Sequence, residues 1–243
     1  MRDIFIDDDF ALGGFTSGDS GIWTRESADM PPTDDYTELS RSLGVPFEHM
    51  VRPYQAGGTT VAEVSFRHGG SGIIKDNELK KTDGLVTAQR GLMLTVIAAD
   101  CVPIYLADSE AAVIGLLHCG RQAAAGELLG SGISLMEKLG ASAERLSMTI
   151  GHHICGSCYE VGEEVTGEFT GGFTEAELGN IFRRKDGKLY LDLAAALTYK
   201  AESYGIASDR IFRTSVCTCH GRGFYSYRRG DRGRQDLAFF MMK

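Results

Sequence analysis

A cysteine and a histidine stand at the ends of two short apolar segments. Cys101 directly precedes the run Val102–Leu106. His118 directly follows the run Val113–Leu117. If the two runs pair as an antiparallel hairpin, the cysteine and the histidine lie at the same end of it. A thiolate beside an imidazole can act as a nucleophile with its base, or the pair can supply two ligands for zinc. Both residues could instead be ordinary members of a core.

Four further cysteines form a CxxC and a CxC. Cys155 and Cys158 make the first pair, and Cys217 and Cys219 make the second, which His220 follows. Together they could form a structural zinc site, although zinc ribbons use two CxxC pairs and CxC is a poor chelating step. Cys155 and Cys158 could equally pack as reduced cysteines without a ligand.

Arginines lie beside aromatic residues near the C-terminus. Arg228 and Arg229 follow Tyr227, and Arg234 follows a few residues later. Guanidinium groups next to aromatic rings can bind a phosphate or a purine. The same segment could instead be a charged strand edge that faces solvent.

Strands and helices must alternate to position these residues. Residues 11–44 lack periodicity and predict loops with at most short elements, such as a helix over 35–43. Beyond the two runs above, strand-length segments are Val61–Phe66, Leu92–Ala98, Arg145–Ile150, Ile211–Val216 and Asp236–Met241. Helical patterns cover Gln122–Leu139 and Asp192–Tyr204. This mixture predicts an α/β or α+β fold, and the absence of a linker or repeat favours one domain.

Composition and charge exclude several classes of protein. The chain has 243 residues, a hydrophobic fraction of 43% and a formal net charge of −8. It has no long run of Lys and Arg, which argues against nucleic acid as a partner. It shows neither a signal peptide nor an apolar run of membrane-spanning length, so we expect a cytosolic protein with reduced cysteines and no membrane partner.

Five ordered motifs resemble one known family. They are Asp83–Thr87, Ala99–Pro103, His118–Gly120, Cys158–Gly162, and Cys217-Thr218 together with Ser226–Arg229 and Gly233–Gln235. In this order they are similar to the YfiH or laccase-domain family, also called multicopper polyphenol oxidoreductases. That family includes purine nucleoside phosphorylases and peptidoglycan editing factors.

The resemblance implies mixed β-sheets sandwiched between helices in a single domain over residues 1–243, with residues 1–50 as a divergent N-terminal part. It implies zinc bound by two histidines and a cysteine, with Cys101 and His118 as two of these ligands and as catalytic residues. It further implies phosphorolysis of adenosine, inosine or methylthioadenosine, with adenosine deamination as a second activity. The partners would then be a purine nucleoside and phosphate. Weaker candidates for binding these substrates are Gln55, Arg228, Arg229 and Arg234.

The chain departs from the family pattern at the site. The family's first histidine follows a glutamine by two positions, and here Gly57 stands at that place after Gln55. A third ligand would have to come from His68, His152 or Cys119. Two alternatives therefore stay open: a metal-free Cys-His hydrolase acting on an amide or a peptidoglycan precursor, and a non-catalytic ligand-binding paralogue. Copper chemistry ranks last, since six scattered histidines are few for a multicopper site.

Overall fold

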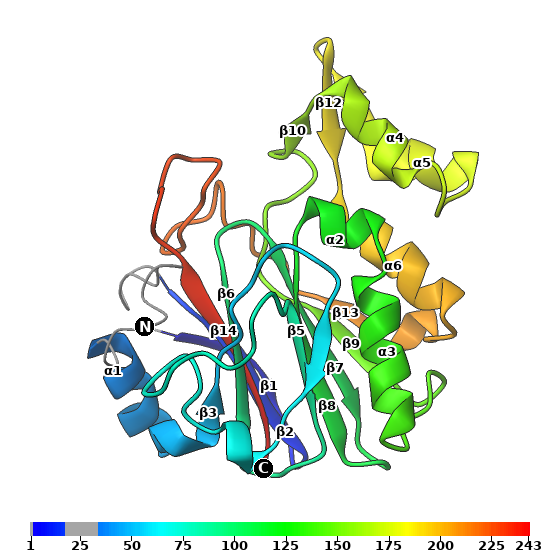
Figure 1. The fold of residues 1–243 in the computed structure, drawn as a ribbon. Coiled ribbons are helices and arrows are strands. Elements are labelled where there is room, and N and C mark those ends of the chain that lie inside the picture. The colour runs from blue at the N-terminus through cyan, green and yellow to red at the C-terminus, as the bar shows by residue number, and fades with distance from the viewer. Residues whose placement is uncertain (1, 18–33) are drawn as a thin grey trace.

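Two β-sheets face one another in the computed structural model, and helices cover their outer surfaces (Figure 1). The structure describes residues 2–17 and 34–243, so residues 1 and 18–33 of the divergent N-terminal part lie outside the described residues. The first sheet contains, in spatial order, β13 (Ile211–Arg213), β9 (Ser147–Ile150), β7 (Val102–Asp108), β8 (Val113–Cys119), β5 (Gly84–Thr87) and β4 (Val61–Glu63). The second contains β1 (Arg2–Asp7), β2 (Ala11–Thr16), β14 (Asp236–Met242), β6 (Met93–Ala98) and β3 (Met50–Val51).

Three hydrophobic cores hold the layers together. The largest lies between the six-stranded sheet and the helices α2 (Arg121–Ala125), α3 (Leu128–Lys138) and α6 (Leu193–Ser203). The second lies between the two sheets, where the Tyr105 hydroxyl donates to the Gly14 carbonyl at 2.7 Å. The third lies under α1 (Asp34–Leu43). Because β6 is buried on both faces, all its residues can be apolar or small, which explains its continuous hydrophobic run.

A small third sheet projects from one end of the molecule (Figure 1). It contains β10 (Glu160–Val161), β12 (Lys188–Leu191) and β11 (Phe182–Lys185). The helices α4 (Thr166–Phe169) and α5 (Glu175–Ile181) accompany it. Elsewhere in the described chain, single-turn helices cover residues 47–49, 66–68, 163–165 and 208–210. None of the helices in the described part of the chain is long and apolar enough to cross a membrane.

The mixed α/β class with sheets between helices is confirmed. The described part of residues 11–44 holds two short elements, the expected helix α1 and the strand β2, in which Gly14 allows a close approach that a side chain would block. A Cβ there would lie 2.5 Å from the Asp3 carbonyl oxygen. The single helix expected over 122–139 is divided after Ala125, where the buried Lys200 ammonium donates to the carbonyls of Ala125 and Gly126.

Candidate active site

The hairpin expected from the sequence forms and brings Cys101 and His118 to one end. β7 pairs with β8 in antiparallel register, with Val102 opposite Cys119 and Pro103 opposite His118. Cys101 immediately precedes β7, and its thiol and the His118 imidazole are hydrogen-bonded. Gly120 leaves room for the sulfur, since a Cβ at this position would lie 3.2 Å from Cys101 Sγ.

A buried carboxylate, Asp83, contacts the Nδ1 atom of the His118 imidazole. Its Oδ1 lies 3.1 Å from His118 Nδ1. The backbone N–H groups of Ala56, Gly57 and Gly58 also donate to this carboxylate, at 3.1, 2.8 and 2.8 Å. Antiparallel pairing of β5 with β8 places the two residues side by side, and the His118 N–H donates to the Asp83 carbonyl at 2.7 Å. The result is a chain of contacts from carboxylate to imidazole to thiol.

This environment makes His118 a strong base. Burial alone would lower its pKa, but the charge interaction with Cys101 and hydrogen bonds to Asp83 and Cys101 outweigh burial and raise the pKa to about 9. Burial likewise opposes ionisation of Asp83, yet hydrogen bonds from His118, Gly58 and Gly57 lower the pKa of that carboxyl. At neutral pH the pair is therefore imidazolium and carboxylate.

We expect Asp83→Asn to lower the His118 pKa by about 1 to 3 units, because a neutral amide no longer stabilises the imidazolium. Titration of the His118 ring nitrogens by NMR measures this shift. In the wild type, the raised pKa contributes stability below the unfolded value of 6.5, and this contribution is lost as pH rises through about 9. Asp83 contributes stability above its unfolded value, which is lost as pH falls through its lowered pKa. An unchanged His118 titration in Asp83→Asn contradicts the assigned role.

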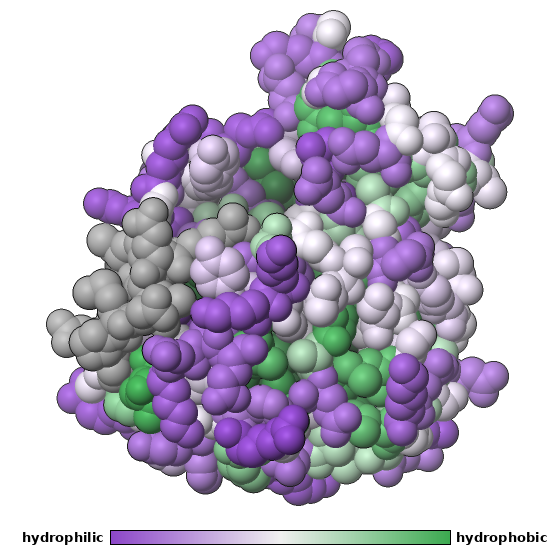
Figure 2. Space-filling view, in the orientation of Figure 1, coloured by the Kyte–Doolittle hydropathy of each residue, from purple (hydrophilic) through white to green (hydrophobic). Residues whose placement is uncertain are grey.

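Cys101 and His118 open into a pocket of about 580 Å³. Its described wall also includes Arg121, Tyr159, Arg228 and Arg234. A recess with hydrophobic atoms at its base lies between the projecting third sheet and the C-terminal loops (Figure 2). The Arg228 guanidinium sits 5.0 Å from the centre of the Tyr159 ring. The pocket thus combines a thiol-imidazole pair with cations and an aromatic surface.

Asp100 fastens the C-terminal loops around this pocket. One carboxylate oxygen accepts from the Thr218 hydroxyl at 2.7 Å. The other accepts from the Ser226 hydroxyl at 3.0 Å and from the Arg228 backbone N–H at 2.7 Å. Asp100 also has a φ of 86°, in the left-handed region that few residues other than glycine adopt. This strained turn aims the following residue, Cys101, into the pocket.

Two of the four predicted substrate-binding residues, Gln55 and Arg229, lie outside the described wall of the pocket. Both ends of the Gln55 amide are hydrogen-bonded to the backbone of Ile97 at 2.8 Å, outside the described pocket wall. The Arg229 guanidinium donates to the carbonyls of Thr218 and Cys219 at 2.9 and 3.1 Å and so anchors its own loop. Arg228 and Arg234 are the two predicted arginines that line the pocket.

The described residues do not provide a three-ligand zinc site at this pocket. Gly57 has no ligating side chain, and a Cβ built on it meets nothing within 4 Å. The candidate replacements are engaged elsewhere: His152 binds Thr214 and Asp3 at 3.0 and 2.8 Å. His68 Nδ1 accepts from the Ser65 backbone at 3.1 Å.

Cys119 is not a substitute ligand in this arrangement. Its side chain packs in the core beneath the helices, and burial raises the pKa of its thiol. Within the described residues, the cluster that can bind a metal ion with three or more ligands lies elsewhere, at Cys155, Cys158, Cys217 and His220.

Asp83, Asp100 and Tyr159 were not among the site residues predicted from the sequence. All three belong to the ordered motifs. The motifs therefore included these residues, but nothing in the sequence assigned a role in the site to any of them. Arg121 was likewise not among the predicted site residues, and in the structure it lines the pocket and pairs with Glu168.

Comparison with known proteins identifies the family. Residues 28–243 match the family model described as multi-copper polyphenol oxidoreductase laccase. A protein of Deinococcus radiodurans named purine nucleoside phosphorylase is 33% identical over 227 residues, which cover 91% of this chain and 83% of the relative. A protein of an unknown prokaryotic organism named adenosine deaminase RL5 is 32% identical over 195 residues, covering 79% of this chain and 74% of that protein.

The fold agrees with this match. The crystal structure of the Bacillus licheniformis hypothetical protein YfiH superposes with a TM-score of 0.85 at 23% identity, covering 99% of each chain. The family model and the sequence relatives span most of the chain, including both strands of the Cys101–His118 hairpin. This chain therefore belongs to the multi-copper polyphenol oxidoreductase laccase family, and resembles members named purine nucleoside phosphorylase.

Proposed function

We propose that this chain is a purine nucleoside phosphorylase, which uses phosphate to cleave adenosine, inosine or methylthioadenosine. The observation that carries the proposal is that Cys101 and His118 share one pocket with Arg121, Arg228 and Arg234. Phosphate, as an anionic co-substrate, requires such cations. A departing purine requires a proton donor, which the His118 imidazolium supplies. The family relatives named for this activity support the same assignment.

Each residue has a separate task in the proposed reaction. Arg234 binds phosphate together with the Arg228 guanidinium nitrogens that are not held by the Cys158 and Glu160 carbonyls. One phosphate oxygen forms a bond to the anomeric carbon as the bond from that carbon to the purine breaks. The bonding electrons leave with the purine, which takes the Nε2 proton of His118. The Cys101 sulfur lies beside the imidazolium and would, as a thiolate, stabilise it and the positive charge that develops on the ribose. Asp83 keeps the ring oriented, and phosphate or solvent returns the proton to His118.

No step of this reaction is assigned to a metal, because the described pocket supplies two of the three protein ligands that the family pattern requires. Zinc dependence is the narrower form of the proposal, and it needs a third ligand from outside the described residues. Elemental analysis of zinc in Cys101→Ala and His118→Ala tests it: if zinc is held at this pocket, the content falls by one ion per chain in both variants.

The test is phosphate-dependent release of the purine. Incubation of the protein with adenosine, inosine or methylthioadenosine should yield the free base and a sugar 1-phosphate only when phosphate is present. Inosine formed from adenosine in the same assay reports the second proposed activity, deamination. We expect Arg234→Ala to raise KM for phosphate about 10-fold, since one charge-assisted hydrogen bond is lost.

Two controls keep this test specific. Arg210→Ala removes an arginine that lies outside this pocket and should leave KM for phosphate unchanged. Base release at equal rate with and without phosphate would show a hydrolase and contradict the proposal. A folded protein that turns over none of the three nucleosides would support the non-catalytic ligand-binding alternative.

A second candidate is a metal-free hydrolase acting on an amide or a peptidoglycan precursor. It is favoured by the line from Asp83 through His118 to Cys101, which is the order of orienting acid, base and nucleophile in thiol hydrolases. In that reaction the Cys101 sulfur would attack the carbonyl carbon and form a thioester as the amine leaves with a proton from His118, and water would then cleave the thioester to release the acid and the thiol. Mass spectrometry of protein quenched with substrate distinguishes the two, because phosphorolysis forms no acyl adduct on Cys101.

A further inference from the structure

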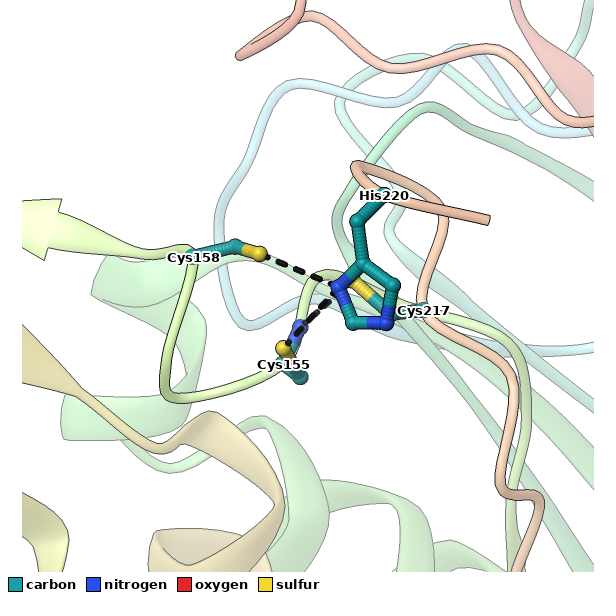
Figure 3. A group of neighbouring side chains, drawn as sticks. All are labelled: Cys155, Cys158, Cys217 and His220. Carbon is teal, nitrogen blue, oxygen red and sulfur yellow. Dashed lines mark hydrogen bonds between the residues drawn. The ribbon is translucent and has the colours of Figure 1, made fainter. Parts of the chain in front are cut away.

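Three cysteines and a histidine point toward one another outside the Cys101–His118 pocket (Figure 3). They come from two loops that are far apart in the sequence. They are Cys155 and Cys158, between β9 and β10, and Cys217 and His220, after β13. The ligand atoms of all four residues lie within 4.8 Å of one another. None of the four forms part of the described wall of the Cys101–His118 pocket, so this cluster is a separate feature.

Backbone pairing holds the two loops together before any ligand is considered. β13 runs parallel to β9, and the pairing continues as a bridge between His153 and Cys217. The Thr218 N–H donates to the His153 carbonyl at 3.0 Å. A tight turn follows in the first loop, where the Cys158 N–H donates to the Cys155 carbonyl at 3.0 Å. The main chain therefore aligns the CxxC turn with the CxCH segment.

The distances suit a tetrahedral ion. Zinc–sulfur bonds of about 2.3 Å place neighbouring ligand atoms about 3.5 to 3.8 Å apart. His220 Nδ1 lies 3.2 Å from Cys158 Sγ and 3.7 Å from Cys155 Sγ. The Cys155 N–H donates to Cys217 Sγ at 3.3 Å, a bond that stabilises a metal-bound thiolate. We propose that Cys155, Cys158, Cys217 and His220 bind a structural Zn²⁺ ion that is independent of the phosphorylase pocket.

Nearby positive charge supports a thiolate-rich site. Zinc with three thiolates and a neutral histidine carries a net charge of −1, and the thiol protons leave to solvent on binding. A cavity next to the cluster is lined by Cys155 and Ser157 and by the cations Arg183, Arg184, Lys185 and Arg213. Arg184 is paired with Glu163 and Arg213 with Asp192, which also lines this cavity, so Arg183 and Lys185 supply the excess positive charge there. These cations favour the anionic complex over the metal-free thiols.

The ion would stabilise one wall of the active-site pocket. The Arg228 guanidinium donates to the carbonyls of Cys158 and Glu160, at 3.4 and 2.8 Å. Asp100 binds Thr218, which lies between two residues of the CxCH segment. Zinc thus joins the loop that carries Tyr159 to the loop that leads to Arg228, and it acts on catalysis only by fixing their separation.

The decisive measurement compares zinc content in a background without the Cys101 thiol. Cys101→Ala protein, purified without chelator and dialysed under reducing conditions, should retain one zinc per chain. Adding Cys158→Ser or His220→Gln should remove that zinc. Adding Cys219→Ser is the matched control, because Cys219 lies in the same CxCH segment but outside the cluster, and it should retain the zinc.

A spectroscopic measurement on the unmutated chain tests the same site without depending on whether the variants fold. Cobalt(II) added to zinc-depleted wild-type protein should give thiolate-to-metal charge-transfer absorption and the intense visible bands of a tetrahedral ion. Removing zinc should lower the Tm by about 10 °C, because binding to the folded state alone stabilises it.

Several results would overturn the proposal. They are zinc that disappears in Cys101→Ala alone, zinc retained in the Cys101→Ala, Cys158→Ser double variant, copper bound in place of zinc, and a cobalt spectrum without thiolate charge transfer. The proposal would also be overturned if the chain, after reduction and exposure to zinc, were recovered without zinc and with a Cys155–Cys158 disulfide.

Discussion

Replacing Cys101 with alanine should reduce kcat/KM for phosphorolysis by about 100- to 10,000-fold. The substitution removes the sulfur beside the His118 ring, which together with Asp83 raises the His118 pKa to about 9. The proton donor is then less well held and a smaller fraction of it is charged at neutral pH. Steady-state kinetics with saturating phosphate, measured across the neutral to alkaline range, gives the loss directly.

The size of the side chain and the reactivity of the thiol can be separated. Cys101→Ser keeps a side chain of similar shape that can donate a hydrogen bond but forms no thiolate, so its rate should stay close to that of Cys101→Ala. Cys219→Ser removes a thiol that lies outside the pocket and should retain wild-type rates. Full activity in Cys101→Ala would falsify the proposed role of this residue, whichever of the three nucleosides is used.

Replacing Asp100 with alanine should lower the free energy of unfolding by about 3–5 kcal/mol. The carboxylate binds Thr218, Ser226 and the Arg228 N–H, and its removal leaves buried donors without acceptors. Alanine also tolerates the φ of 86° poorly. Urea unfolding followed by circular dichroism measures the change, and phosphorolysis should fall with it because the C-terminal loops no longer enclose the pocket.

Two companion substitutions divide the effect into its causes. Asp100→Asn tolerates the left-handed backbone and keeps one acceptor oxygen, so it should lose less stability than Asp100→Ala. Asp209→Ala changes an exposed carboxylate in a surface turn and should alter the stability by less than about 0.5 kcal/mol. Equal unfolding midpoints for wild type and Asp100→Ala would show that these hydrogen bonds do not hold the loops.

The sequence by itself determined the pairing of Cys101 with His118. Two apolar runs joined by a short connection can pair with each other only as an antiparallel hairpin, and the residues at its open end are then neighbours. The same local logic located the helix over 192–204, because an Asp cap and a following glycine mark its ends. The order of the motifs was also sufficient to indicate the family and its mixed fold.

Only the tertiary structure decided which residues serve that pair. Asp83 lies 35 positions before His118 in the sequence. Asp100 binds Thr218 and Ser226, which follow it by 118 and 126 positions. The metal-binding cluster joins residues 62 and 65 positions apart, through parallel pairing of β13 with β9. Local patterns record periodicity and turn chemistry, whereas these contacts depend on how sheets and loops pack. The CxxC and CxCH segments looked incomplete as separate zinc motifs because neither is a site until the parallel strands bring them together.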